Sequence, residues 1–246
     1  MTKKLSLIFP AYNEAARLPR CLETAVEYFR VQPWDTEIIV IENGSTDNTY
    51  SLALELMLEA ARQPYHNLTY KVNRSQPGKG FACREGVKVA TGDFILISDV
   101  DLSTPLSEVY KLLAAHNDTQ ADFIIGSRRA PGGLVLGRSW DRKLAGWLFS
   151  GLVRTLAPGI KDTQCGFKLI TSQAANKIRP LMTIGGFSFD VEMIYLARRL
   201  GYSVKEIPVN WVHDYDSKVR PITDGANMAL EIITIWHNIL NGSYKA

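Results

Sequence analysis

The chain has 246 residues, of which 46% are hydrophobic, and a formal net charge of +3 at pH 7. This length and apolar content suffice for one full hydrophobic core, so a single domain is expected. The small net charge and the lack of a basic run interleaved with aromatic residues exclude a typical nucleic-acid-binding protein. Three widely spaced cysteines, Cys21, Cys83 and Cys165, fit neither a disulfide framework nor a zinc cluster, and they predict a cytosolic protein.

Strands and helices are predicted to alternate over the first 130 residues. The predicted strands are 5–9, 37–41, 68–72, 94–98 and 122–127, with apolar residues at helical spacing between them. Pro10 is expected to end the first strand, and Asn13 to cap the helix that follows. Gly78-Lys79-Gly80 opens the third helix, and Pro105 starts the fourth. This alternation predicts an α/β fold with a mostly parallel central sheet flanked by helices.

The second half contains two amphipathic segments. Residues 140–156 carry apolar residues at helical spacing with a basic flank, a pattern that fits either a packed helix or a membrane-surface helix. The final predicted helix, 226–240, is apolar except for a narrow polar stripe, formed by Asn227, Glu231, Thr234 and Asn238. A buried, a dimer-forming and a membrane-facing helix all fit that pattern.

Membrane-spanning and exported proteins are not expected. No apolar run approaches the roughly 20 residues that span a bilayer. The first strand starts within a few residues of Met1, which leaves no room for a signal peptide. We therefore expect a protein that is soluble or bound only to a membrane surface.

Chemically distinctive residues follow each predicted strand, and in a parallel sheet these positions meet at one edge, where ligands bind. Asp99-Val100-Asp101 comes directly after the buried run 94–97, so one carboxylate can face a nucleotide and the other a divalent metal. The other loops carry an aromatic residue, acids, a glycine–lysine turn and arginines: Pro10, Ala11, Tyr12 and Glu14; Glu42, Asn43 and Ser45; Gly78, Lys79 and Gly80; Arg128 and Arg129. Taken singly, each of these features is explained without a ligand, by turn formation, packing or surface charge. Together they favour a site for a nucleotide diphosphate with Mg²⁺ or Mn²⁺.

Several of these motifs resemble the family 2 glycosyltransferases with the A-type, Rossmann-like fold. They are PAYNE (10–14), ENGSTD (42–47), GKG (78–80) and DVD (99–101). Three later motifs are similar to the branch of the dolichyl-phosphate glucosyltransferases and dolichyl-phosphate mannose synthases: DTQCGFK (162–168), FDVE (189–192) and PVNW (208–211) followed by SK (217–218). The resemblance implies a single catalytic domain over 1–225, with a nucleotide-sugar half (1–130) and an acceptor half (131–225). Residues 226–246 would form a C-terminal amphipathic helix.

The resemblance also implies roles for the matched residues. The donor-binding set is Pro10, Ala11, Tyr12, Glu14, Glu42, Asn43, Gly78, Lys79, Asp99, Val100 and Ser217. Asp101, with Asp99, would bind the metal, while Lys218 and Ser217 would close over the pyrophosphate. Arg128 and Arg142 would contact phosphates of the donor or acceptor. This chain has Asn43 where the family usually has Asp. It also has Ser103 where mannose synthases have a metal-binding Gln, so water is expected to complete the coordination of the metal.

The expected reaction is inverting transfer of a hexose, glucose by the closer resemblance, from a donor of the UDP-glucose or GDP-mannose type to a polyprenyl (dolichyl-type) phosphate. The metal and Lys218 would neutralise the leaving diphosphate. An acceptor phosphate is already anionic and needs no strong base, and Arg128 and Arg142 would orient it. A hydroxyl acceptor does need a base, and Asp190 is the candidate, although Asp190 is equally well explained as the N-cap of a helix over 191–200.

Alternatives remain at this point. The chain could be a family 2 enzyme that acts on a soluble or saccharide hydroxyl, and the glucosyl enzymes' N-terminal membrane anchor is not expected here. A sugar nucleotidyltransferase would carry a glycine-rich basic loop after the first strand, which PAYNE does not provide. A non-enzymatic nucleotide-sugar sensor would not need the intact acidic pair. We expect a cytoplasmic location, peripheral on the inner face of a membrane, with no nucleic-acid partner and with homo-oligomer formation left open.

Overall fold

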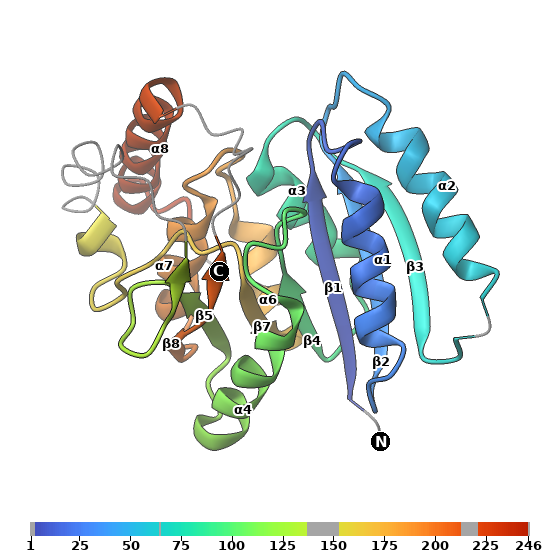
Figure 1. The fold of residues 1–246 in the computed structure, drawn as a ribbon. Helices are drawn as coiled ribbons and strands as arrows, with labels where there is room; N and C mark the ends of the chain where they lie inside the picture. Colours follow the sequence, from blue (N-terminus) through green and yellow to red (C-terminus); the bar gives the residue numbers. More distant parts are fainter. Residues whose placement is uncertain (1–2, 64, 137–152, 213–220, 246) are drawn as a thin grey trace.

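The computed structural model describes residues 3–63, 65–136, 153–212 and 221–245, and it is built around a seven-stranded sheet (Figure 1). The strand order is β3-β2-β1-β4-β7-β5-β8, and β7 runs antiparallel to both of its neighbours. The strands are β1 (Lys4–Ala11), β2 (Asp35–Glu42), β3 (Leu68–Arg74), β4 (Phe94–Ile97), β5 (Phe123–Ser127), β7 (Lys168–Thr171) and β8 (Val204–Pro208). A small parallel sheet pairs β6 (Val135–Leu136) with β9 (Trp211–Val212). The predicted α/β fold with a mostly parallel sheet is confirmed.

Helices cover both faces of the sheet (Figure 1). One face carries α1 (Leu18–Phe29), α2 (Thr49–Ala61) and α4 (Val109–Thr119); the other carries α3 (Lys79–Val89), α6 (Ser172–Ile178), α7 (Phe189–Arg199) and α8 (Pro221–Leu240). Side chains of a strand alternate between the two faces, so β1 sends Leu7 and Phe9 into one core and Ile8 into the other. Because both faces of the sheet are buried, its central strands have continuous apolar sequences.

The order in which strands are added to the sheet reverses between β1 and β4. β2 lies on one side of β1 and β4 on the other, and such a reversal is where open α/β sheets bind ligands, at the carboxyl ends of the strands. Tyr12 follows β1 at this edge, and Asp99 follows β4. Because β7 is antiparallel, it begins at this same edge, where its first residue, Lys168, is aligned with Ile97.

The prediction that Pro10 ends the first strand was wrong, because β1 continues to Ala11. Ile8 accepts a hydrogen bond from Ser98 N at 3.0 Å, so even-numbered residues of β1 face β4. The missing N–H of Pro10 therefore points to the side where β4 has already ended at Ile97, and no ladder hydrogen bond is lost.

Helix starts also differ from expectation. Asn13 does not cap α1, which begins at Leu18; its backbone has φ +53°, and its Oδ1 accepts a hydrogen bond from Thr46 N at 2.7 Å. Pro105 precedes a 3₁₀ turn, η1 (Leu106–Glu108), and α4 begins only at Val109. A second 3₁₀ turn, η2 (Arg179–Leu181), follows α6.

The last helix, α8, packs with part of its polar stripe facing inward. Glu231 Oε2 accepts a hydrogen bond from Ser188 N at 2.8 Å, and Asn238 Nδ2 donates to Thr183 Oγ1 at 2.9 Å. Ile232 and Ile235 are fully buried, whereas three large apolar residues are 57–81% exposed: Leu230, Ile233 and Leu240. The outward surface of α8 is therefore markedly apolar.

The basic segment 140–156 lies outside the described residues except for 153–156, which are helical. Among the helices that the structure describes, none combines the length and hydropathy needed to cross a membrane.

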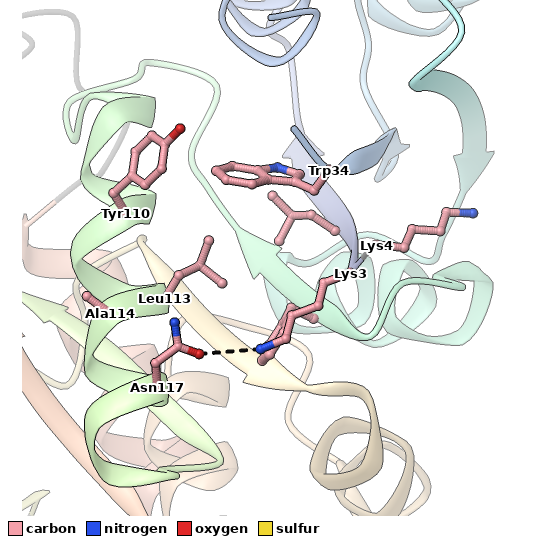
Figure 2. Close-up of a pocket in the computed structure, with 9 residues that line it drawn as sticks. Lys3, Lys4, Trp34, Tyr110, Leu113, Ala114 and Asn117 are labelled. Carbon is pink, nitrogen blue, oxygen red and sulfur yellow. Dashed lines mark hydrogen bonds between the residues drawn. The ribbon is translucent and has the colours of Figure 1, made fainter. Parts of the chain in front are cut away.

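A cavity of about 290 Å³ opens at the amino ends of β1 and β4, beneath Trp34 and beside α4 (Figure 2). Phe94 and Leu113 contribute to its walls. Lys3 lies at its rim, where its Nζ donates to Asn117 Oδ1 at 3.3 Å. The cavity is at the opposite edge of the sheet from Asp99 and Asp101, so it is separate from the predicted nucleotide site.

Candidate functional site

The acidic pair lies in a narrow cleft just beyond β4. The residues lining this cleft are Ser98, Asp99, Asp101, Ser103, Thr104, Gly166, Phe167 and Trp211. Asp99 Oδ1 contacts the Lys79 ammonium at 2.6 Å, whereas Asp101 Oδ1 accepts a hydrogen bond from Ser103 N at 2.9 Å. Asp101 makes no ion pair with a described residue. The two carboxylates thus lie together, but among the described residues a cationic side chain contacts only Asp99.

This arrangement perturbs the two carboxylates in opposite directions. Burial raises the pKa of Asp101, and the neighbouring charge of Asp99 raises it further. Burial also acts to raise the pKa of Asp99, but the Lys79 ammonium, together with the charges of Lys168 and Arg128, outweighs it and holds that pKa below its usual value. A cation bound beside Asp101 would relieve the repulsion between the two carboxylates.

The donor set of the cleft fits a magnesium or manganese ion carried on a diphosphate. Over the described residues, no group of three or more His, Cys, Asp and Glu side chains is arranged to hold a metal by itself. Mg²⁺ in nucleotide sites is commonly bound by one or two carboxylates, with phosphate and water filling the other positions. Asp101 and Asp99 match that requirement.

The Gly78–Gly80 turn directs Lys79 toward Asp99 by packing tightly against the loop before α7. Gly78 has φ +128°, and a Cβ there would lie 2.3 Å from Gly185 O. Gly80 N donates to the same carbonyl at 2.8 Å. This N–H is therefore engaged within the protein, and Lys79 is the part of the turn that contacts Asp99.

Glu192, the last residue of FDVE, holds the loop against which this turn packs. It is 0% exposed, and its carboxylate accepts hydrogen bonds from Thr183 N at 2.9 Å and Ile184 N at 3.0 Å. It also accepts from Thr183 Oγ1 and from Tyr244 Oη, each at 2.7 Å. The sequence alone predicts no role for Glu192. Its position inside an apolar helical stretch is the signal that could have indicated a buried polar partner.

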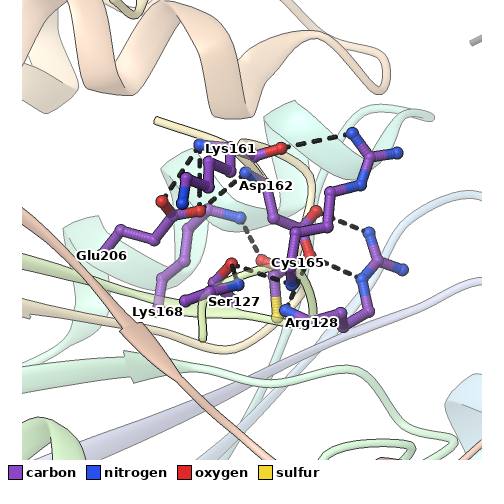
Figure 3. A network of polar contacts seen from close by, with 9 residues as sticks. Ser127, Arg128, Lys161, Asp162, Cys165, Lys168 and Glu206 are labelled. Carbon is purple, nitrogen blue, oxygen red and sulfur yellow. Dashed lines mark hydrogen bonds and ion pairs between the residues drawn. The ribbon is translucent and has the colours of Figure 1, made fainter. Parts of the chain in front are cut away.

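Arg128 is fixed by Asp162, the first residue of DTQCGFK (Figure 3). Arg128 Nε and Nη2 each donate to Asp162 at 2.7 Å, and Arg128 N donates at 3.0 Å. The Arg128 guanidinium also lies 5.4 Å from the Trp211 ring centroid. Although burial acts against ionisation, Arg128 holds the pKa of Asp162 below its usual value. Within the part of the chain that the structure describes, Arg128 Nη1 has no hydrogen-bond partner, so one edge of the guanidinium is left for a ligand.

Asp190 is not the N-cap of α7, because Ser188 occupies that position and Asp190 lies within the first turn. It is 4% exposed, and its Oδ1 lies 2.7 Å from Nζ of Lys168, which is 1% exposed. Burial raises the pKa of Asp190, while Lys168 and Lys79 act in the opposite direction. Among the described residues that line the cleft, Asp190 is not included. The prediction of a cap is thus wrong, and the carboxylate is held in a buried ion pair.

The other residues of the predicted donor-binding set divide into exposed and engaged groups. Tyr12 is 47% exposed beyond β1, whereas Glu14 forms a two-point pair with Arg17 at 2.7 and 2.8 Å. Glu42 accepts from Arg74 Nε at 2.9 Å and from Ser45 N; these contacts lower its pKa although burial opposes them. The remaining members are buried or half-buried: Pro10, Ala11, Asn43 and Val100, of which Val100 packs into the core. Arg142, Ser217 and Lys218 lie outside the described residues.

Residues 6–179 match the model of the family described as glycosyl transferase family 2. The chain belongs to glycosyl transferase family 2. The resemblance found in the motifs is confirmed, and the protein is a glycosyltransferase rather than a nucleotidyltransferase or a sensor.

Curated family 2 relatives extend the similarity over nearly the whole chain. The dolichyl-phosphate beta-glucosyltransferases of Dictyostelium discoideum and Homo sapiens are 34% and 33% identical to it. These alignments cover 98% and 99% of this chain, and 76% and 78% of the relatives. Glucosyl-3-phosphoglycerate synthase from Mycobacterium tuberculosis, solved with Mn²⁺, UDP-glucose and phosphoglyceric acid, superposes with a TM-score of 0.65 at 18% identity, covering 95% of this chain and 78% of that one. That structure shares the fold.

Proposed function

We propose that this family 2 glycosyltransferase transfers glucose, with inversion, from a UDP-glucose-type donor to a polyprenyl phosphate of the dolichyl type. The observation that carries the proposal is the acidic pair in the cleft beyond β4, in which Lys79 pairs with Asp99 but not with Asp101. The names of the relatives support the sugar and the acceptor. The UDP-glucose complex of a protein with the same fold supports a uridine nucleotide.

The residues around the cleft have complementary tasks in this reaction. A bound Mg²⁺ or Mn²⁺, held by Asp101 with Asp99, would neutralise charge on the leaving diphosphate. Lys79 keeps Asp99 ionised, and Asp162 orients Arg128 so that its Nη1 edge can bind a phosphate. From their motifs, Lys218 and Ser217 are proposed to close over the donor pyrophosphate, and Arg142 to bind phosphate.

The surroundings of Asp190 support a phosphate acceptor rather than a hydroxyl. A hydroxyl nucleophile needs a base within hydrogen-bond reach of its proton. Asp190 lies outside the set of cleft-lining residues, and its carboxylate contacts the buried Lys168. A phosphate oxygen is already anionic, so its attack on the sugar requires no such base.

A lipid acceptor requires contact with a membrane, and the exposed apolar residues of α8 support membrane-surface binding. Leu230 and Ile233 are one turn apart and face away from the protein, because the buried side of α8 is formed by Ile232 and Ile235. Amphipathic helices bind the headgroup boundary through such faces, and a basic flank strengthens binding to anionic lipids. The basic segment 138–156 is proposed to provide that flank. We place the protein in the cytoplasm, peripheral to the inner face of the membrane.

Flotation with phosphatidylcholine–phosphatidylglycerol vesicles tests this attachment. We expect the protein to float at low salt, and the double variant Leu230→Ser with Ile233→Ser to float several-fold less. The matched control is Leu54→Ser with Leu58→Ser, which changes two exposed leucines on α2 and should float like the wild type. If the α8 variant floats normally but changes from dimer to monomer in light scattering, the face pairs two subunits and the membrane assignment is wrong.

The function itself is tested by a donor screen that measures nucleoside diphosphate release with and without polyprenyl phosphate. We expect UDP-glucose to be used, with release strongly accelerated by the lipid phosphate and abolished by chelator. Release that is indifferent to the lipid but accelerated by a soluble hydroxyl acceptor would contradict the proposal.

A further inference from the structure

Four charged side chains of alternating sign lie together at the floor of the cleft. Lys79 Nζ contacts Asp99 Oδ1 at 2.6 Å, and Lys168 Nζ contacts Asp190 Oδ1 at 2.7 Å. The two pairs are close enough that Lys79 and Asp190 act on each other's pKa. The chain of charges therefore runs Asp99, Lys79, Asp190, Lys168. Its outer member, Asp99, lines the cleft, and its inner member, Lys168, is 1% exposed.

Lys168 has a second contact, with the backbone that leads to Gly166 beside Asp99. Its Nζ donates to the carbonyl oxygen of Cys165 (Figure 3). That carbonyl belongs to the peptide bond that leads into Gly166. The backbone of Gly166 lies so close to Asp99 that a Cβ built on it would be 2.0 Å from Asp99 Oδ2.

Two groups that lie against the Asp99 carboxylate are thus linked to Lys168. One is Lys79, which pairs with Asp99 and also interacts electrostatically with Asp190, the ion-pair partner of Lys168. The other is Gly166, whose preceding carbonyl is held by Lys168 directly. A lysine without polar partners would be costly to bury here. The burial of Lys168 is therefore explained by its ion pair with Asp190 and its hydrogen bond to Cys165, and not by packing alone.

We propose that Lys168 is a positioning residue for the transfer reaction, which fixes the Asp99 carboxylate through the Cys165–Gly166 peptide and through Asp190 and Lys79. The proposal rests on the proposed function in placing the donor at Asp99. Lys168 touches no substrate in this scheme. Its contribution is to keep a cleft carboxylate in one place, and misplacing a reacting group by about 1 Å can cost about a hundredfold in rate.

The test compares variants that differ only in the Lys168 contact to Cys165. Lys168→Met alone leaves Asp190 buried without its partner and can fail to fold. The reference is therefore Asp190→Asn, in which Lys168 can still donate to Cys165, and the test variant combines Asp190→Asn with Lys168→Met. A second test variant, Gly166→Ala, pushes on Asp99 from the cleft side and leaves the buried charges intact.

Two readouts separate positioning from a merely structural role. The first is kcat per folded enzyme at saturating UDP-glucose, beside UDP affinity measured calorimetrically in excess EDTA. The second is Mn²⁺ affinity in the presence of UDP, measured from the free-ion signal by electron paramagnetic resonance. We expect the double variant and Gly166→Ala each to lower kcat and Mn²⁺ affinity about tenfold relative to their references, with UDP affinity in EDTA unchanged within twofold.

The inference is overturned if the folded double variant matches Asp190→Asn in both readouts, or if Gly166→Ala matches the wild type. Equal losses of UDP affinity in EDTA would also overturn it, because they would indicate general damage to the site. Absence of turnover in the wild type would instead count against the proposed function, and the Mn²⁺ titration would then decide the role of Lys168 alone.

Discussion

Replacing Glu192 with glutamine should destabilise the protein substantially, although the two side chains have the same shape. The fully buried carboxylate accepts three hydrogen bonds on Oε1 and one, from Ile184 N, on Oε2. In Glu192→Gln, one of these oxygens becomes an NH₂ group that faces a donor. In the less costly orientation it faces Ile184 N, so two buried donors are left without an acceptor, Ile184 N and the new amide NH₂. At about 1–2 kcal/mol each, the expected loss of unfolding free energy is about 2–4 kcal/mol.

Denaturant unfolding followed by circular dichroism measures this loss, which corresponds to a fall in Tm of about 6–12 °C for a chain of this size. The matched control is Glu85→Gln on α3, because Glu85 pairs at 3.1 Å with Lys88, whose side chain is 58% exposed. Surface pairs of this kind contribute about 0–1 kcal/mol. A loss in Glu192→Gln that is no larger than in Glu85→Gln would refute the assignment of Glu192 as the support of the 183–185 loop.

Three further predictions concern individual charges. Asp101→Asn should lower turnover by about a hundredfold or more without lowering Tm, because it removes a metal ligand and a like-charge repulsion; near-normal turnover would contradict the metal assignment. Arg128→Lys should weaken transfer to polyprenyl phosphate more than slow hydrolysis of the donor. The guanidinium of Arg128 binds Asp162 through Nε and Nη2 and keeps Nη1 for the acceptor phosphate, whereas a lysine ammonium cannot make both contacts with Asp162 and also bind the phosphate. Equal losses in both reactions would mean that Arg128 serves the donor. For Glu37, burial is outweighed by hydrogen bonds from Lys71 and others, and its pKa is lowered from 4.5 to about 2. The resulting stability, about 3 kcal/mol, is present above pH 4.5 and is lost as the pH falls to about 2, so the Glu37→Gln variant should show a flatter pH dependence of unfolding in that window.

Much of the sheet could be predicted because parallel strands buried on both faces carry continuous apolar runs. The runs before Pro10 and Asp99 are of this kind. Strand ends were less predictable, because the tolerance of Pro10 within β1 depends on where β4 stops. The antiparallel direction of β7 has no local signal either. It is set by the long connection from β5 and by pairing with β4.

The candidate site was predictable where function depends on residues that directly follow strands. The structure brings Asp99, Asp101 and Lys79 together at one edge, as their positions after β4 and at the start of α3 indicate. Contacts between distant segments were not predictable. Asp190 pairs with Lys168 across 22 positions of sequence, and nothing near either residue identifies the other. The same holds for Glu192 and Tyr244, which are 52 positions apart.

Transfer of labelled glucose in a competition between two acceptors tests the central claim most directly. The enzyme would be given UDP-[¹⁴C]glucose, Mg²⁺, and equal concentrations of a polyprenyl phosphate and of the corresponding polyprenol, which offers a hydroxyl on the same lipid. The account predicts that label enters the lipid phosphate almost exclusively, in a β-linked product, because a phosphate oxygen attacks without a base while Asp190, the candidate base for a hydroxyl, is held in a buried ion pair with Lys168. Comparable labelling of the polyprenol, or labelling of neither lipid while UDP-glucose is consumed, would contradict it.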